Sequence, residues 1–203
     1  MSTHRSRTAD PLPDVPSGST MGMWGMWLTV GVLLAGLAGL GAAALYLHSG
    51  QPAWPPDGVS SPASARAVAG VLLAAVALTV LTVARRWLIS GPRTAVAPLL
   101  LVAMGASIAS VWSLVTDLLD APFRWDEHAY TSVYWVLTGS AAMFVGVATL
   151  MLGAVLVQRL TDILDARRML ELEVTLTYLR FAVLATVVLL GLVHLLPDPG
   201  GGL

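Results

Sequence analysis

Long uncharged stretches alternate along the chain with short segments that hold nearly all of its charges. A helix needs roughly 20 apolar residues to cross a hydrocarbon layer of about 30 Å. Four stretches meet this length without a charge, and a fifth meets it if it includes Arg180. We therefore predict an all-α fold, a polytopic membrane protein that forms a bundle of five transmembrane helices. The predicted spans are about residues 21–47, 67–89, 94–116, 129–158 and 174–196.

The segments outside the spans divide the chain further. Residues 1–20 are polar and rich in proline, which predicts a disordered N-terminal segment. The first apolar stretch is too long for the core of a signal peptide, and no suitable cleavage site follows it, so we interpret it as a retained helix. The five-helix membrane domain is expected at residues 21–197, and residues 198–203 form a tail.

The arginines predict the orientation of the bundle. Two, Arg66 and Arg124, lie in the loops of one side, whereas eight lie on the other side. The positive-inside rule then places the N-terminus in the cytoplasm and the C-terminus outside. The eight residues are Arg5, Arg7, Arg85, Arg86, Arg93, Arg159, Arg167 and Arg168.

Composition supports the membrane interpretation and excludes several functions. Hydrophobic residues make up 56% of the chain and charged residues 11%, whereas soluble domains have about 25% charged residues. A net charge of −1 gives no basic surface for nucleic acid. The absence of cysteine excludes disulfides, zinc–thiolate sites and iron–sulfur clusters. We see no arrangement of catalytic residues, so we expect no intrinsic active site, cofactor or metal.

Small residues recur at helical spacing in three of the spans, which is typical of helices that pack closely in lipid. We expect these stripes to form helix contacts, and we assign those of the first and fourth spans to contacts with another subunit or with lipid. The stripes are Gly31, Ala35 and Gly39 in the first span; Ala67, Gly70, Ala74 and Ala77 in the second; and Gly139, Ala142 and Gly146 in the fourth.

Most of the tryptophans lie near the predicted ends of the spans, as in the aromatic belts of membrane proteins. Trp112 lies deeper, and we expect it to pack inside the bundle. The belt residues are Trp24, Trp27, Trp54, Trp87, Trp125 and Trp135.

Ionisable residues at membrane depth mark functional sites, and the first four spans have none in their middles. This pattern argues against a pump, a transporter or a proton channel that acts alone. Arg180 is the exception: it either snorkels to the cytoplasmic interface or contacts a lipid phosphate or an acidic group of a partner subunit. Glu173, two turns earlier, could pair with Arg180 only loosely. We expect Arg180 to be a buried polar contact.

Three histidines, His48, His128 and His194, fall towards the predicted outer face. Imidazoles together with nearby carboxylates could hold a divalent metal, and two imidazoles could ligate a haem. No pair of them has ligand spacing within one helix, so interfacial histidines are the alternative that we favour.

Four motifs, in order along the chain, resemble subunit III of the haem-copper oxidases in its five-helix bacterial form. The first motif includes Trp27, and the last includes Glu173. The motifs are Gly25-Met26-Trp27-Leu28; Trp54-Pro55-Pro56 with Gly58; Tyr130-Thr131-Ser132-Val133-Tyr134-Trp135-Val136-Leu137-Thr138-Gly139; and Glu173 with Tyr178 and Phe181.

The buried polar residues of that family are missing here. Leu33 stands at the place of a glutamate in the first helix, and Ala141 and Phe144 stand at the places of two histidines. Arg180 replaces a histidine in the last motif, and 111–115 lack the polar pair of the third helix. Because such groups are costly in lipid and usually functional, their loss predicts a packing subunit rather than one that handles protons.

The resemblance implies an accessory subunit without a cofactor, in the plasma membrane of a bacterium. Its partners would be the catalytic subunit I, the other oxidase subunits and membrane lipids. It would stabilise the catalytic subunit together with its lipid and proton-entry environment. Three alternatives remain open: an accessory subunit of a nitric oxide reductase, a small membrane haem or metal protein that uses the outer histidines, and a scaffold without a respiratory partner.

Overall fold

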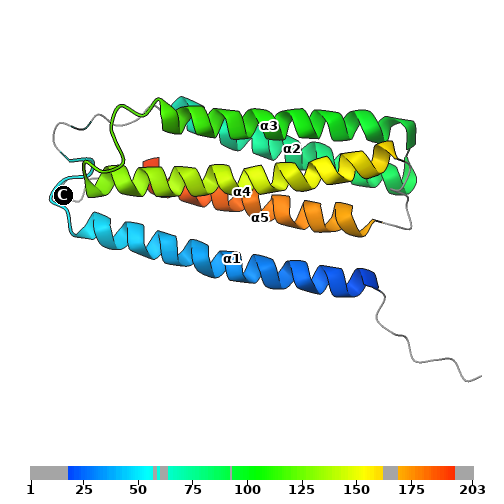
Figure 1. Ribbon diagram of the computed structural model, residues 1–203, viewed down its shortest axis with the longest axis horizontal. Coiled ribbons are helices and arrows are strands. Elements are labelled where there is room, and N and C mark those ends of the chain that lie inside the picture. Colours follow the sequence, from blue (N-terminus) through cyan, green and yellow to red (C-terminus); the bar gives the residue numbers. More distant parts are fainter. Residues whose placement is uncertain (1–17, 57–58, 60–63, 92, 162–168, 195–203) are drawn as a thin grey trace, which may run out of the picture.

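The computed structural model describes residues 18–56, 59, 64–91, 93–161 and 169–194. Within them the chain forms long α-helices, one short 3₁₀ turn and no strand (Figure 1). The predicted all-α fold with five spans is therefore confirmed, whereas residues 1–17 and the tail lie outside the described residues. The elements are α1 (Gly18–Ser49), α2 (Ser64–Ser90), η1 (Arg93–Ala95), α3 (Val96–Leu119), α4 (Ala129–Leu160) and α5 (Leu170–His194).

Each of the five α-helices is long and apolar enough to cross a membrane. A helix suits lipid because it satisfies its backbone hydrogen bonds within its own segment. Threonine hydroxyls follow the same rule: Thr82, Thr149 and Thr186 each donate a hydrogen bond to the carbonyl oxygen four residues earlier. The helices therefore carry hydroxyl groups in their spans without leaving those donors unsatisfied.

Four of the helices form a closed ring, and the fifth lies outside it. α2 packs on α3, α3 on α4, α4 on α5, and α5 returns to α2. α1 packs against α5 and touches α4 less, and Figure 1 shows it set apart along one side of the bundle. Most of the surface of α1 is consequently exposed in the single chain.

The stripe of small residues on α2 packs as the sequence predicts. Ala67, Ala74 and Ala77 are fully buried. A Cβ atom built on Gly70 would lie 2.7 Å from Cδ2 of Leu114 on α3, so only glycine fits this approach without movement of its neighbour. The small residues thus bring α2 and α3 into close contact.

A row of serines on α3 joins it to both neighbours. Ser110 Oγ donates a hydrogen bond to the carbonyl oxygen of Gly70 at 2.7 Å. Ser113 Oγ donates to the carbonyl oxygen of Arg66 at 2.8 Å, and Ser107 Oγ shares a bond of 2.6 Å with Thr149 Oγ1 on α4. The row fixes the position of α3 between α2 and α4.

The stripe on α1 does not pack within this chain, and its assignment to a contact with another subunit or with lipid stays a prediction. Gly31, Ala35 and Gly39 are exposed, and a Cβ atom on either glycine would meet nothing within 4 Å. α1 instead packs through a line of larger side chains on another face, which includes Val30 and Leu37. The spacing of the small residues identifies one face of α1. The larger side chains of the other face bury more apolar area against the bundle, so that face packs instead.

The stripe on α4 is divided. Ala142 is buried within the bundle, in a cluster with Leu114 and Leu190. Gly139 and Gly146 are half-buried, and a Cβ atom on Gly146 would meet nothing within 4 Å. Part of this stripe therefore packs inside the chain, and part of it remains open.

We predict that Gly70→Val destabilises the bundle by about 1–3 kcal/mol, because the added methyl groups force the fully buried Leu114 out of its place. The measurement is thermal unfolding of the purified chain in detergent micelles. Gly105→Val is the matched control, since Gly105 lies exposed on α3 with nothing within 4 Å of an added Cβ. Equal melting temperatures for the two variants would contradict the close approach.

Candidate functional site

The two ends of the bundle differ in chemistry. We call the end where α1 begins the arginine end, because Arg85, Arg86 and Arg159 lie there. We call the other end the aromatic end, after a cluster that includes Trp54 and Tyr130. The predicted orientation would make the arginine end cytoplasmic.

At the arginine end, Arg85 of α2 pairs with Glu173 of α5. The guanidinium Nε donates a hydrogen bond to Oε1 of the carboxylate, and both side chains are partly buried. α2 ends beside the start of α5, so these side chains meet at the same depth. Arg180 lies about 10 Å further along α5 and is not the partner that the structure gives to Glu173.

Arg180 is exposed on the outer face of α5, so it is not a buried contact within this chain. It shares that face with Leu184, Val187 and Val188, which are also exposed. The Cα–Cβ bonds of a helix tilt towards its N-terminus, and α5 begins at the arginine end. The Cα–Cβ bond of Arg180 therefore points towards the arginine end.

At the aromatic end, six rings follow one another in edge-to-face contact. Ring centroids lie between 5.0 and 6.4 Å apart. Trp54, only 4% exposed, and Phe123 come from the loops that follow α1 and α3, so both loops fold back over the helix ends. The Trp54–Pro55 peptide bond is cis. The rings, in order of contact, are His48, Trp54, Tyr130, Phe123, Tyr134 and His194.

A buried carboxylate lies within this cluster. Asp117 is 6% exposed and accepts a hydrogen bond of 2.7 Å at Oδ2 from the phenol of Tyr134, which is itself buried. The predicted third span ends at residue 116, just before Asp117, whereas the structure includes Asp117 in α3. The spacing of Ser107, Ser110 and Asp117 on one helical face was the signal that could have located it.

The middle of the bundle is apolar where the resemblance predicts lost polar groups. Phe144 is buried with its ring centroid 5.2 Å from that of Phe181, and Phe181 also contacts Tyr178. Ala141 is fully buried. These side chains fill the space between α4 and α5 by packing alone.

The outer histidines have separate surroundings. His48 contacts Trp54, His194 contacts Tyr134, and His128 immediately precedes α4 in an exposed position. In the part of the chain that the structure describes, no group of three or more His, Asp or Glu side chains could hold a metal ion. The observed contacts give no specific support to the metal or haem alternative.

The tryptophans follow the predicted belt with two corrections. Trp24, Trp27 and Trp125 are exposed near helix ends, as in a belt. Trp112, expected inside the bundle, is 71% exposed, because an apolar side chain gains as much from lipid as from a protein interior. Trp54, expected in the belt, is buried in the aromatic cluster.

Comparison with known proteins gives one family match. Residues 41–195 match the family model described as cytochrome c oxidase subunit III. The match covers about three quarters of the chain and extends from the last turns of α1 through α5. No curated protein matches the sequence.

We predict that Tyr134 and Asp117 stabilise the aromatic end as a coupled pair. Tyr134→Phe and Asp117→Ala should each destabilise the chain, and the double variant should lose less than the sum of the two. The coupling free energy should be on the order of 0.6–1.7 kcal/mol, the range for hydrogen bonds between membrane helices. Unfolding of all four proteins in micelles measures the coupling, and additive losses would count against it.

The ion pair between α2 and α5 permits a charge-swap experiment. Arg85→Glu and Glu173→Arg should each lower the melting temperature, because each places like charges at the contact. The double variant restores opposite charges and should recover much of the loss. Arg86→Glu is the control, since Arg86 is exposed next to the pair. A double variant less stable than either single one would overturn the pairing.

Proposed function

Because the chain belongs to the cytochrome c oxidase subunit III family and is a subunit III-like component of a haem-copper oxidase, we propose that its role in the complex is structural. It stabilises the catalytic subunit and shields the lipid and proton-entry environment of that subunit in aerobic respiration. Electron transfer and oxygen reduction then take place in other subunits.

The apolar interior of the bundle is the observation that carries this proposal. Phe144, Phe181 and Ala141 fill the middle of the bundle, and the ionisable pair Arg85–Glu173 lies at one end of it. A pathway for protons needs ionisable groups or water at membrane depth. Tight apolar packing supports a role in assembly rather than in proton transfer.

The outward face of α1 supports a contact with the catalytic subunit. Gly31, Ala35 and Gly39 leave open space on a helix that the bundle covers on one side only. Small residues let a second helix approach closely, and close packing drives helix association in lipid. We assign this face, with the exposed Trp27 beside it, to a helix of the catalytic subunit. On α4, the part of the stripe of small residues that remains open to such a contact is Gly146.

Arg180 supports a second contact, on α5. The Cα–Cβ bond of Arg180 points towards the arginine end, where an acidic group can meet the guanidinium. In our proposal that group is a lipid phosphate or a carboxylate of a neighbouring subunit, and the positive-inside rule makes this leaflet the cytoplasmic one of a bacterial plasma membrane. Glu173 contributes indirectly, because it holds α2 against α5.

We predict that deletion of the gene lowers the yield and stability of the oxidase complex, and that the wild-type chain restores both. In the deletion strain, the variant Gly31→Leu/Gly39→Leu should accumulate in the membrane like the wild-type chain. It should not co-purify with the catalytic subunit, because the added side chains fill the stripe of small residues on α1. The measurement is the amount of catalytic subunit recovered with the tagged chain after solubilisation of native membranes.

Gly25→Leu/Gly36→Leu is the matched control for that experiment. Both glycines lie on α1 with nothing within 4 Å of an added Cβ, on a face turned by roughly 90° from the stripe. Both double variants should keep the melting temperature of the wild-type chain, because leucine favours a helix more than glycine does. Unchanged oxidase yield without the gene, or equal co-purification of both variants, refutes the proposal.

A further inference from the structure

We propose that Tyr134 is a redox-active tyrosine, which gives one electron to a peroxyl radical while its phenolic proton passes to Asp117. The proposal goes beyond the structural role described above and does not depend on it, because the reacting groups all belong to this chain. It concerns single encounters with radicals of the hydrocarbon layer, and it is separate from the respiratory transfer of electrons in other subunits.

The phenol of Tyr134 has a proton acceptor at hydrogen-bond distance. Its hydroxyl donates to Oδ2 of Asp117 at 2.7 Å, and the two residues are 1% and 6% exposed. Proton transfer needs a donor and an acceptor about 2.6–3.2 Å apart, and this pair meets that condition. A phenol that loses an electron becomes strongly acidic, so the adjacent carboxylate allows the electron and the proton to leave together.

The proposed step balances in electrons, protons and charge. The electron passes to the peroxyl radical, which becomes a peroxide anion and then takes a proton from water. The O–H bond of the phenol breaks, and a new O–H bond forms at Oδ2 of Asp117. Tyr134 becomes a neutral phenoxyl radical beside a neutral carboxylic acid. The buried pair thus ends without a charge, which an apolar interior favours.

Aromatic rings extend from Tyr134 towards the loop that follows α1. The ring centroid of Phe123 lies 5.2 Å from that of Tyr134 and 5.9 Å from that of Tyr130. Tyr130 in turn lies 5.0 Å from Trp54, which belongs to the loop. Phenol and indole rings are the most readily oxidised apolar side chains of a chain without cysteine. The oxidised state can therefore be shared among neighbouring rings at the aromatic end.

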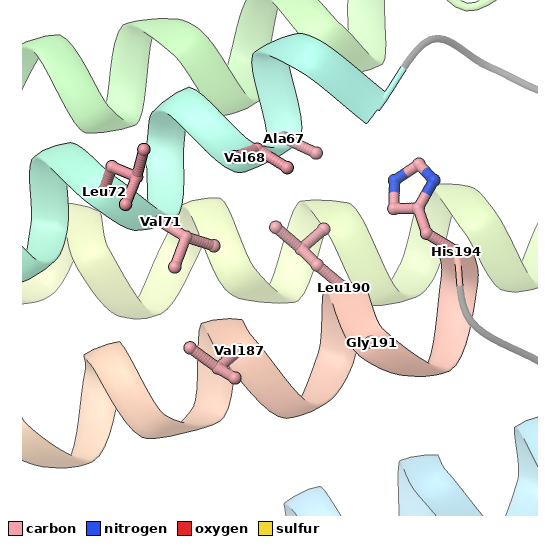
Figure 2. A pocket seen from close by; sticks show the side chains of 8 residues that line it. All are labelled: Ala67, Val68, Val71, Leu72, Val187, Leu190, Gly191 and His194. Carbon is pink, nitrogen blue, oxygen red and sulfur yellow. The ribbon is translucent and has the colours of Figure 1, made fainter.

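On its other side, Tyr134 is separated from the hydrocarbon layer by one ring. The ring centroid of His194 lies 6.4 Å from that of Tyr134, and His194 also lines an apolar groove of about 340 Å³ between α2 and α5. Figure 2 shows its imidazole at one end of this groove, beyond the side chains of Leu190 and Val187. Oxidants that dissolve in hydrocarbon can therefore approach to within one ring of Tyr134.

Tyr178 provides an internal comparison. It is also buried, at 5% exposed, and its ring contacts Phe181. Among the described residues, no carboxylate lies at hydrogen-bond distance from its hydroxyl. Loss of an electron from Tyr178 would leave a charged ring in an apolar interior, which is costly. Burial alone therefore does not make a tyrosine redox-active, whereas burial next to Asp117 does.

Photolysis of an apolar azo compound in oxygenated detergent micelles tests the inference, because it generates peroxyl radicals around the purified full-length chain. All proteins carry Tyr46→Phe, since Tyr46 is 78% exposed and would react directly. We expect an EPR signal that narrows when the tyrosine rings are deuterated, as a tyrosyl radical requires. Tyr134→Phe should lose this signal. Tyr178→Phe is the matched control and should keep it.

A second variant separates proton transfer from a structural role. The amide oxygen of Asp117→Asn still accepts the hydrogen bond of the phenol, but it does not take up the proton. Formation of the phenoxyl radical, followed by its absorption after a laser flash, should slow by about 100-fold. Asp117→Glu retains a carboxylate and should recover much of the rate. In the parent protein the rate should fall in D₂O.

Absence of a tyrosyl signal in the parent protein, or a signal that survives Tyr134→Phe, overturns the inference. Equal loss in Tyr178→Phe, or an unchanged rate in Asp117→Asn, overturns it as well. None of these measurements involves the catalytic subunit, so they are distinct from the test of the proposed function. A tyrosyl radical at Tyr134 in a chain whose deletion leaves the oxidase unchanged would refute the proposed function alone.

Discussion

Hydrocarbon offers no hydrogen-bond partner, and most of this structure follows from that one constraint. The backbone satisfies its hydrogen bonds by forming helices. The buried hydroxyls of Thr149 and Thr186 donate to carbonyl oxygens of their own helices. Ser110 instead donates its hydrogen bond to a neighbouring helix, at the carbonyl oxygen of Gly70. The same requirement places the buried carboxylate of Asp117 against the phenol of Tyr134. Polar groups inside the bundle thus act as fixed links between helices, and packing fills the remainder.

The helices have two kinds of surface, one packed inside the ring and one exposed on α1. Inside the ring of α2, α3, α4 and α5, small residues bring backbones together, and the serines of α3 hold them there. α1 packs on the ring through larger side chains and leaves its own small residues open. A chain that buries one helix so incompletely has a surface available for assembly. This open surface of α1 is the one that we propose for contact with the catalytic subunit.

The interior of the ring explains why a structural role fits the family membership. Phe144, Phe181 and Tyr178 occupy the middle of the bundle in edge-to-face contacts. Such packing stabilises a helix pair without a charged side chain. The ion pair Arg85–Glu173 lies at the arginine end, where it joins two helices. In the structural role that we propose, the chain contributes its shape and its apolar surface to the complex.

The sequence by itself determined the number of spans, the helical fold and the close-packing face of α2, because hydropathy and the spacing of small residues are local properties of the chain. It also determined the family, through motifs that survive at loops and helix ends. Only the tertiary structure decided which helix face meets which neighbour. The stripe of small residues that includes Gly31 is exposed. Asp117 is buried, and Glu173 pairs with Arg85. A periodic pattern defines a face, but its partner depends on where the other helices lie, and that information is spread over residues far apart in the chain.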